Sequence, residues 1–577
     1  MSIDTPQVRT RRGSELFLLA CGLGIGAMAY AIIGFALDDS IPAEFFTFIA
    51  TMSVLGLLLH AVIRKAAPFA DPLIMPIAFA LNNVGLAMIF RISRAMDSDL
   101  ATKQLGWTAV SIVACAVVVF FVKDHRILRR YTYVTMLSAL VLAMLPLVPF
   151  LGREINGAQI WIHIGPFSLQ PAEFSKILLA VFFAGYLVEN RDRLALAGPK
   201  IAGIQLPRMR DFGPIILVWV TSIVILVMQR DLGTSLLIFG LFVAMLYIAT
   251  ERISWIVIGF LMFSVGVVAA LSQFTHVQSR FDAWLHALDN EVFNAEFGGS
   301  GQLVRGMYGM ASGGLFGTGL GEGRPTIVPF SYSDFIFASL GEELGLTGIF
   351  AILLLYVLFV QRGFRVALGT RDGFGKLLAS GLAFVIAWQM FVVIGGVTRV
   401  IPLTGLTTPF MAYGGSSLLA NWVIVAILLR ISDNARRPSP LPLRGATGSE
   451  DDGTRRRSAV INDANVQAVD PHDQPEQNTE HFQWMNQLDN AGTQVIQRRD
   501  VISAQEAPAT TDAQPVAPGG ESGRPTTAPT PHAAPSFPSA RSAQSQGSPR
   551  TSPDLPAVPQ PEQDHTPPRY SRREDSE

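Results

Sequence analysis

Charged residues are scarce in this chain, and cysteine is almost absent. Asp, Glu, Lys and Arg make up 15% of its 577 residues, whereas soluble globular proteins have about 25%. Its two cysteines, Cys21 and Cys115, lie in apolar stretches, where a thiol behaves as a small hydrophobic group. These shortages argue against a structural disulfide, a thiol catalyst and a zinc site, and the histidines show no metal-ligand spacing.

Long apolar runs recur from Glu15 to about Arg430. A bilayer core about 30 Å thick needs about 20 apolar residues per helix, and runs this long and continuous favour helices over a barrel. The sequence therefore predicts an all-α polytopic membrane bundle of about twelve transmembrane helices. The expected spans are 15–36, 43–63, 73–90, 106–122, 132–150, 170–189, 212–229, 232–249, 253–271, 334–360, 375–395 and 408–430. Gly22, Gly24 and Gly26 in the first span are expected helix-packing positions.

Lys and Arg gather in alternate connections between these spans. Because positive residues concentrate in cytoplasmic loops, the pattern predicts an inner (cytoplasmic) membrane protein with both termini in the cytoplasm. No small-residue cleavage site follows the first span, so this span is expected to remain as an anchor.

Three regions follow from composition. Residues 1–72 hold two additional helices, and residues 73–435 form the main membrane core. Residues 436–577 turn to Pro, Ser, Thr, Ala, Gln and charged residues, which predicts a disordered cytoplasmic tail. That tail is either a solvated extension or a site of phosphorylation and cytoplasmic docking.

Two outer loops stand out, residues 151–169 and the longer 272–333. The longer loop starts with an amphipathic stretch, 281–289, which could lie in the membrane interface. Its glycine-rich part, 317–324, lacks the Gly-Lys-Ser/Thr ending of a phosphate loop and is expected to give flexibility.

Ionisable residues are costly inside a membrane, so the few present are candidate functional residues. Gln170, Glu173 and Lys176 open the sixth span, with Glu173 and Lys176 on one helix face. They fit a functional site and an ion pair that fixes helix packing about equally well. Asp231, in the turn between spans seven and eight, is a second candidate, with a helix cap as the alternative.

Asp334 lies where the long outer loop enters the tenth span. A carboxylate there can be partly desolvated and still reachable from outside, which suits a general base, although a helix N-terminus also favours an acid. Glu342 and Glu343 lie roughly 12 Å deeper along the helix and need partners, such as Arg399 or water. Arg399 follows in a Pro- and Gly-rich segment, 395–417, and is a candidate phosphate ligand.

These segments together resemble the SEDS family of bacterial cell-wall proteins (RodA and FtsW). The resemblance covers about residues 73–435 and rests on Asn156–Trp161, Gln170–Lys176, Ser333–Gly345 and Pro402–Ser417. It implies a SEDS-like ten-helix core preceded by two extra N-terminal helices. Those helices, with 409–417, make the chain most like the RodA type of actinobacteria.

The resemblance implies a peptidoglycan glycosyltransferase that polymerises lipid II at the outer face of the membrane, for cell elongation and shape and also for division. It implies a class B penicillin-binding transpeptidase as partner and Asp334 as the catalytic carboxylate. It also implies Gln170, Glu173, Lys176 and Asp231 as substrate-binding residues. Lys176 and Arg399, with Mg²⁺ or Mn²⁺, would then face the leaving diphosphate.

Two alternatives stay open. Twelve spans with embedded acids also fit a lipid II flippase, although the halves show no repeat and the candidate residues lie outward. A scaffold with an inert core and a recruiting tail is the third hypothesis.

Overall fold

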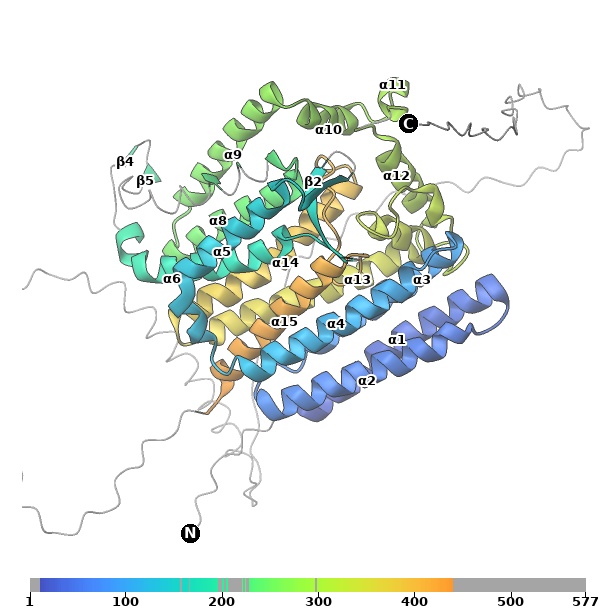
Figure 1. Ribbon diagram of the computed structural model, residues 1–577, viewed down its shortest axis with the longest axis horizontal. Helices are drawn as coiled ribbons and strands as arrows, with labels where there is room; N and C mark the ends of the chain where they lie inside the picture. The colour runs from blue at the N-terminus through green and yellow to red at the C-terminus, as the bar shows by residue number, and fades with distance from the viewer. Residues whose placement is uncertain are drawn as a thin grey trace, which may run out of the picture. The chain divides into compact units, whose positions relative to one another are not determined.

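The computed structural model describes residues 11–438, except 156–157, 166, 196–199, 202–203, 206–219, 222–223, 225–227 and 296–297. Its helices are mostly the long apolar runs of the sequence (Figure 1). They are α1 (Arg12–Asp38), α2 (Ala43–Ala66), α3 (Ile74–Ala95), α4 (Leu100–Phe121), α5 (Thr132–Met144), α6 (Ala172–Ala195), α8 (Leu232–Thr250), α9 (Ser254–Gln273), α10 (Thr275–Leu285), α11 (Asn290–Phe293), α12 (Gly301–Gly313), α13 (Ile336–Gly369), α14 (Gly373–Val397) and α15 (Gly415–Arg436). Short 3-10 turns η1 (His125–Tyr131), η2 (Leu145–Leu147) and η3 (Pro325–Ile327) supplement them.

Ten helical segments of the described residues are long and apolar enough to cross a membrane, and each coincides with one of the twelve expected spans. The expected span 170–189 is also helical, as α6. The expected span 212–229 falls largely outside the described residues, as does nearly all of the expected tail. The prediction of an all-α, multi-pass membrane bundle is confirmed.

The bundle has a buried centre and an apolar exterior. Helices α3, α14 and α15 are buried along most of their length, whereas α1 and α9 expose large side chains such as Phe17 and Phe260. Lipid is the natural neighbour of such exposed apolar faces. Helix α1 packs on α3, α4 on α15, and α13 on α14.

Small residues bring α1 and α3 together. A Cβ on Gly26 would stand 2.5 Å from the Cβ of Asn83, and one on Gly22 would stand 3.2 Å from Ala80. The prediction that these two glycines pack helices is confirmed. It is wrong for Gly24, where a Cβ would meet nothing within 4 Å.

One end of the bundle carries elements that the sequence did not predict. Residues 151–169, expected as a plain loop, form an antiparallel sheet of β1 (Gly152–Ile155), β2 (Ala158–Ile164) and β3 (Phe167–Leu169), in that order. The long loop 272–333 is largely helical, and α10, α11 and α12 arch over the end of the bundle near β2 (Figure 1).

A separate pair of two-residue strands, β4 (Lys200–Ile201) with β5 (Ile204–Gln205), lies between α6 and α8 in the chain.

The start of the last span was also misplaced. Residues 408–414, expected to be helical, precede α15, which begins at Gly415. This stretch is made of turns and bends, and Tyr413 and Gly414 line a cavity, where irregular backbone is tolerated at membrane depth.

Candidate active site

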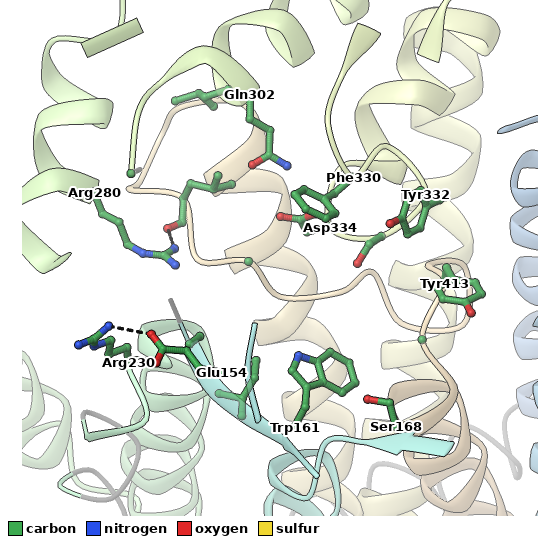
Figure 2. Close-up of a pocket in the computed structure, with 18 of the residues that line it drawn as sticks. Glu154, Trp161, Ser168, Arg230, Arg280, Gln302, Phe330, Tyr332, Asp334 and Tyr413 are labelled. Atoms are coloured by element: carbon green, nitrogen blue, oxygen red, sulfur yellow. Dashed lines mark hydrogen bonds and ion pairs between the residues drawn. The ribbon is translucent and has the colours of Figure 1, made fainter. Parts of the chain in front are cut away.

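A cavity of about 1420 Å³ opens between the sheet, α10 and the turn that precedes α13 (Figure 2). Trp161, Ser168 and Glu154 come from the sheet, and Phe330, Tyr332 and Asp334 face them from the opposite side. Helix α4, the start of α12 and the 403–405 and 413–415 segments complete the lining. A cavity this large exceeds the usual volume of a small-molecule pocket, which suits a bulky substrate.

Asp334 is the candidate residue that lines this cavity. Phe330 adopts a left-handed φ of 54°, and the amide of Ser333 donates to its carbonyl at 2.9 Å. This tight turn delivers Asp334, half-buried, just ahead of α13. Burial raises the pKa of its carboxyl to about 6, although Arg280, Gln302 and two backbone amides act in the opposite direction. Such a group is ionised at neutral pH and basic enough to accept a proton.

Arg280 and Gln302 are site residues that the sequence did not single out. Arg280, on α10, donates from Nη1 to the carbonyl of Leu403 at 2.7 Å and attracts the carboxylates of both Asp334 and Asp231. Gln302, on α12, donates to the Pro329 carbonyl at 2.9 Å beside the Asp334 turn. Arg280 stands just before the amphipathic stretch, but only the folded loop brings it near a carboxylate.

Further basic residues line the cavity. Arg230 lies 3.3 Å from Glu154 on the side of the sheet (Figure 2). Lys103 of α4 and His276 of α10 also belong to the lining. Burial, with Arg230 and Arg280, lowers the pKa of His276 and so favours its neutral form. Arginine and lysine side chains around an open cavity favour an anionic ligand.

The group at the start of α6 lies outside the cavity lining. Lys176 Nζ is 2.5 Å from Glu173 and donates to Gln389 Oε1 at 3.0 Å, and all three side chains are buried. The backbone amide of Gln170 donates to the Ser416 hydroxyl at 2.9 Å. These contacts give Glu173 and Lys176 the packing role that was their alternative interpretation. A substrate-binding role for them remains a prediction.

Asp231 caps α8, as its alternative interpretation predicted. Its Oδ1 accepts the Thr234 amide at 2.9 Å. Burial is the largest cause of the raised pKa of Asp231, and the nearby Glu173 raises it further. Hydrogen bonds from Thr234 and the charge of Arg280 lower it. The positive charge that acts on Asp231 is Arg280, which also acts on Asp334.

Arg399 anchors α10 and does not line the cavity. Its Nε donates to the Trp284 carbonyl at 2.7 Å and its Nη2 to the Leu285 carbonyl at 2.9 Å, while the Trp284 indole donates back to the Arg399 carbonyl at 3.1 Å. Trp284 thus contacts protein, and the interface position expected for the stretch 281–289 remains a prediction. The role of Arg399 as a phosphate ligand remains a prediction.

Arg399, the protein partner expected for Glu342 and Glu343, contacts α10 instead. Glu343 accepts from Arg91 Nε at 3.0 Å and from the Gly321 amide at 2.9 Å, and Glu342 accepts the Arg324 amide at 2.7 Å. The glycine-rich loop, which was expected to be flexible, thus donates backbone hydrogen bonds to both acids. Gly345, at φ 66°, breaks α13 so that the loop can enter.

A divalent cation has few protein ligands here. Within the residues that the structure describes, no three His, Cys, Asp or Glu side chains gather closely enough to hold a metal ion. The cavity carboxylates are Asp334 and Glu154, and Glu154 is paired with Arg230. The Mg²⁺ or Mn²⁺ expectation therefore depends on oxygens that a substrate would bring.

The known proteins that are similar to this chain agree with one another in family. The model of a family described as "Cell cycle protein" (FtsW, RodA, SpoVE) matches residues 72–437. Peptidoglycan glycosyltransferase RodA of Mycobacterium tuberculosis is 46% identical over 443 residues, covering 75% of this chain and 93% of that protein. Stage V sporulation protein E of Bacillus subtilis is 33% identical over 386 residues, covering 65% and 99%.

A solved structure shares the fold. It is that of a peptidoglycan synthase complex that coordinates polymerization and crosslinking, with a TM-score of 0.52 and 24% identity, covering 64% of this chain and 99% of that chain. The family match and the relatives together show that the chain belongs to the FtsW, RodA and SpoVE family of cell-cycle proteins.

Proposed function

We propose that this chain is a peptidoglycan glycosyltransferase that polymerises lipid II into glycan strands. The observation that carries the proposal is Asp334, a half-buried carboxylate with a pKa raised to about 6 that faces a large cavity with cationic walls. Relatives that cover most of the chain carry the name peptidoglycan glycosyltransferase.

The chemistry follows from the placement of these charges. The Asp334 carboxylate takes the proton from an acceptor sugar hydroxyl, whose oxygen bonds to the anomeric carbon of the donor sugar. The bond from that carbon to the lipid diphosphate breaks, and the diphosphate leaves with its electron pair. Arg280, Arg230 and Lys103 stabilise the developing negative charge because they line the same cavity. A Mg²⁺ or Mn²⁺ ion, if recruited, would add positive charge with Asp334 and substrate oxygens as ligands.

The charge distribution supports an orientation in the cytoplasmic membrane. Lys and Arg concentrate in the connections at the end opposite the cavity, which supports cytoplasmic termini and a cavity at the outer face. The lipid tail of the substrate then stays in the bilayer beside the apolar exterior of the bundle. A class B penicillin-binding transpeptidase is the proposed partner, supported by the solved complex that couples polymerization with crosslinking.

Cell elongation and shape are the proposed process, with division as a further one. Identity to the RodA of M. tuberculosis is 46%, against 31% to a probable peptidoglycan glycosyltransferase FtsW of Trichlorobacter lovleyi.

Purified chain supplied with lipid II in detergent, with and without its partner transpeptidase, tests the proposal. Glycan strands on a gel, lost in Asp334→Ala, are the expected result. Absence of polymer from the intact chain with its partner would overturn it. Lipid II translocation in liposomes without polymerisation would support the flippase alternative. Chelation by EDTA followed by addition of Mg²⁺ or Mn²⁺ tests the cation.

A further inference from the structure

A second cavity, of about 490 Å³, lies at the other end of the bundle. It is built where the start of α1, the 67–73 connection and the far parts of α13 and α15 meet. Arg362 lies on α13, 28 positions after Asp334, and a helix of that length rises roughly 40 Å. This cavity is therefore separate from the candidate active site. Arg11 and Leu18 belong to the segment that precedes the family match at residue 72.

Four arginines, Arg11, Arg362, Arg365 and Arg436, line this cavity around one carboxylate, Asp71, and we call it the arginine pocket. Asp71 is fully buried, is paired with Arg436 and lies 3.9 Å from Arg362. Among the residues that the structure describes, none forms a hydrogen bond with the buried Nε of Arg362. Arg11 and Arg365 are exposed, and the ion pairs that the described residues form in this cavity are those of Asp71 with Arg436 and Arg362. One carboxylate thus faces four cations, which leaves guanidinium donors for an anion.

The frame of the arginine pocket is fixed by buried contacts. Arg12 donates to the carbonyls of Ala67 and Ala70 at 2.9 and 2.8 Å, and the Phe69 amide donates to Asp433 at 2.8 Å. The Asp71 amide donates to the Ser432 hydroxyl at 2.9 Å. Because α1 and α15 both hold the 67–73 connection, the pocket is preformed, and an anion would not have to order it.

The apolar surroundings favour a lipid over a soluble anion. Leu18, Phe69 and Leu73 line the pocket beside the arginines. On the same turn of α1, Leu16 and Phe17 are exposed, in the part of a membrane helix that faces acyl chains. Basic pockets between the ends of membrane helices bind phosphate headgroups while apolar surfaces hold the chains.

We propose that the arginine pocket binds the phosphate headgroup of an anionic phospholipid. The guanidinium groups of Arg362 and Arg365 contact the phosphate oxygens, and Arg11, just before α1, closes the site. The start of α1, which lies outside the family match, therefore completes a lipid site at the end remote from Asp334.

Native mass spectrometry of the full chain in detergent with phosphatidylglycerol tests this, with phosphatidylcholine and inorganic phosphate as the other arms. Each lost charged hydrogen bond lowers affinity about tenfold, so Arg11→Gln with Arg365→Gln should lose bound phosphatidylglycerol by at least that factor. Arg362→Gln should do the same. Arg129→Gln with Arg130→Gln, exposed at the same end, removes equal charge and should retain the lipid.

Equal loss in the Arg129 and Arg130 pair would overturn the proposal, since general charge attraction would then explain binding. Displacement of the lipid by inorganic phosphate would assign the pocket to a free anion. A Leu18→p-benzoylphenylalanine chain should crosslink to lipid on irradiation. A crosslink to residues 439–577 would make the chain's own tail the occupant. None of these readouts depends on glycosyltransferase activity.

Discussion

Asp334 and Glu343 lie only nine positions apart around the start of α13, yet their surroundings differ completely. Asp334 is half-buried, lines an open cavity and has Arg280 as an electrostatic neighbour. Glu343 is buried and accepts hydrogen bonds from Arg91 and Gly321. The first is available for proton transfer, and the second holds the glycine-rich loop to the helix. The difference shows that surroundings and access, more than residue type, separate a reactive carboxylate from a structural one.

The largest effect is expected at Asp334. Asp334→Asn keeps the shape of the side chain but removes its ability to accept a proton, so lipid II polymerisation should fall about 10²–10⁴-fold. Thermal stability should stay equal or rise, because a carboxyl whose pKa is raised by burial is easier to bury when neutral. Asp289→Asn, exposed in the same outer segment, is the control. Retained polymerisation in Asp334→Asn would reject Asp334 as the base.

Glu343→Gln should reverse that pattern. It leaves the Arg91 guanidinium buried without its counter-charge, which costs about 3–5 kcal/mol of folding free energy. A thermal melt in detergent should show a large loss of stability, while folded protein keeps its activity. Glu322→Gln, exposed on the same loop, should melt like the parent chain. A stable but inactive Glu343→Gln chain would place Glu343 in the chemistry.

The pH profile should follow Asp334. Its pKa of about 6 means that the carboxyl is protonated and inactive below that pH and ionised above it. Polymerisation at saturating lipid II should therefore rise with pH through about 6. A flat profile between pH 5 and 7 would contradict the assignment.

Arg280→Gln should shift this profile. Removing its positive charge raises the pKa of Asp334, because Arg280 favours the ionised carboxylate. The rise in activity should move to higher pH, a change that a purely structural loss would not produce. Arg305→Gln, exposed on α12 and outside the cavity lining, should leave the profile in place.

The smallest overall effect is expected at Arg399. Arg399→Gln removes hydrogen bonds to the Trp284 and Leu285 carbonyls, worth about 1–3 kcal/mol. Melting temperature should drop modestly and turnover should fall less than about tenfold. A large rise in KM for lipid II with unchanged stability would instead support the phosphate-ligand role predicted from sequence.

Much of the fold could be predicted because each membrane helix is specified by one continuous stretch of sequence. An apolar run of about 20 residues has few alternatives in a bilayer, which explains why ten expected spans coincide with helices. The sheet at 151–169 was missed because its short strands lie among polar and glycine residues with weak alternation. The helices of loop 272–333 are short and owe their order to packing, which propensity alone does not reveal.

Asp334 could be placed from its position between a long loop and an apolar run. Arg280 and Gln302 could not, since single polar residues in an irregular segment carry no spacing signal. The pairing of Glu343 with Arg91 could not be predicted either, because Arg91 comes from a helix 252 positions earlier in the chain.

The membrane environment, the long helices and the carboxylate just before α13 could all be predicted from the amino-acid sequence. Hydrophobic length and the cost of burying a charge can be read from a short stretch of chain, which is why these features were predictable. Which charges meet was settled by the tertiary structure. It tied Arg399 to the backbone, Lys176 to Glu173 and Arg91 to Glu343, and it left Arg280 beside Asp334. Electrostatic attraction falls with distance through space, and distances between helices do not exist until they pack.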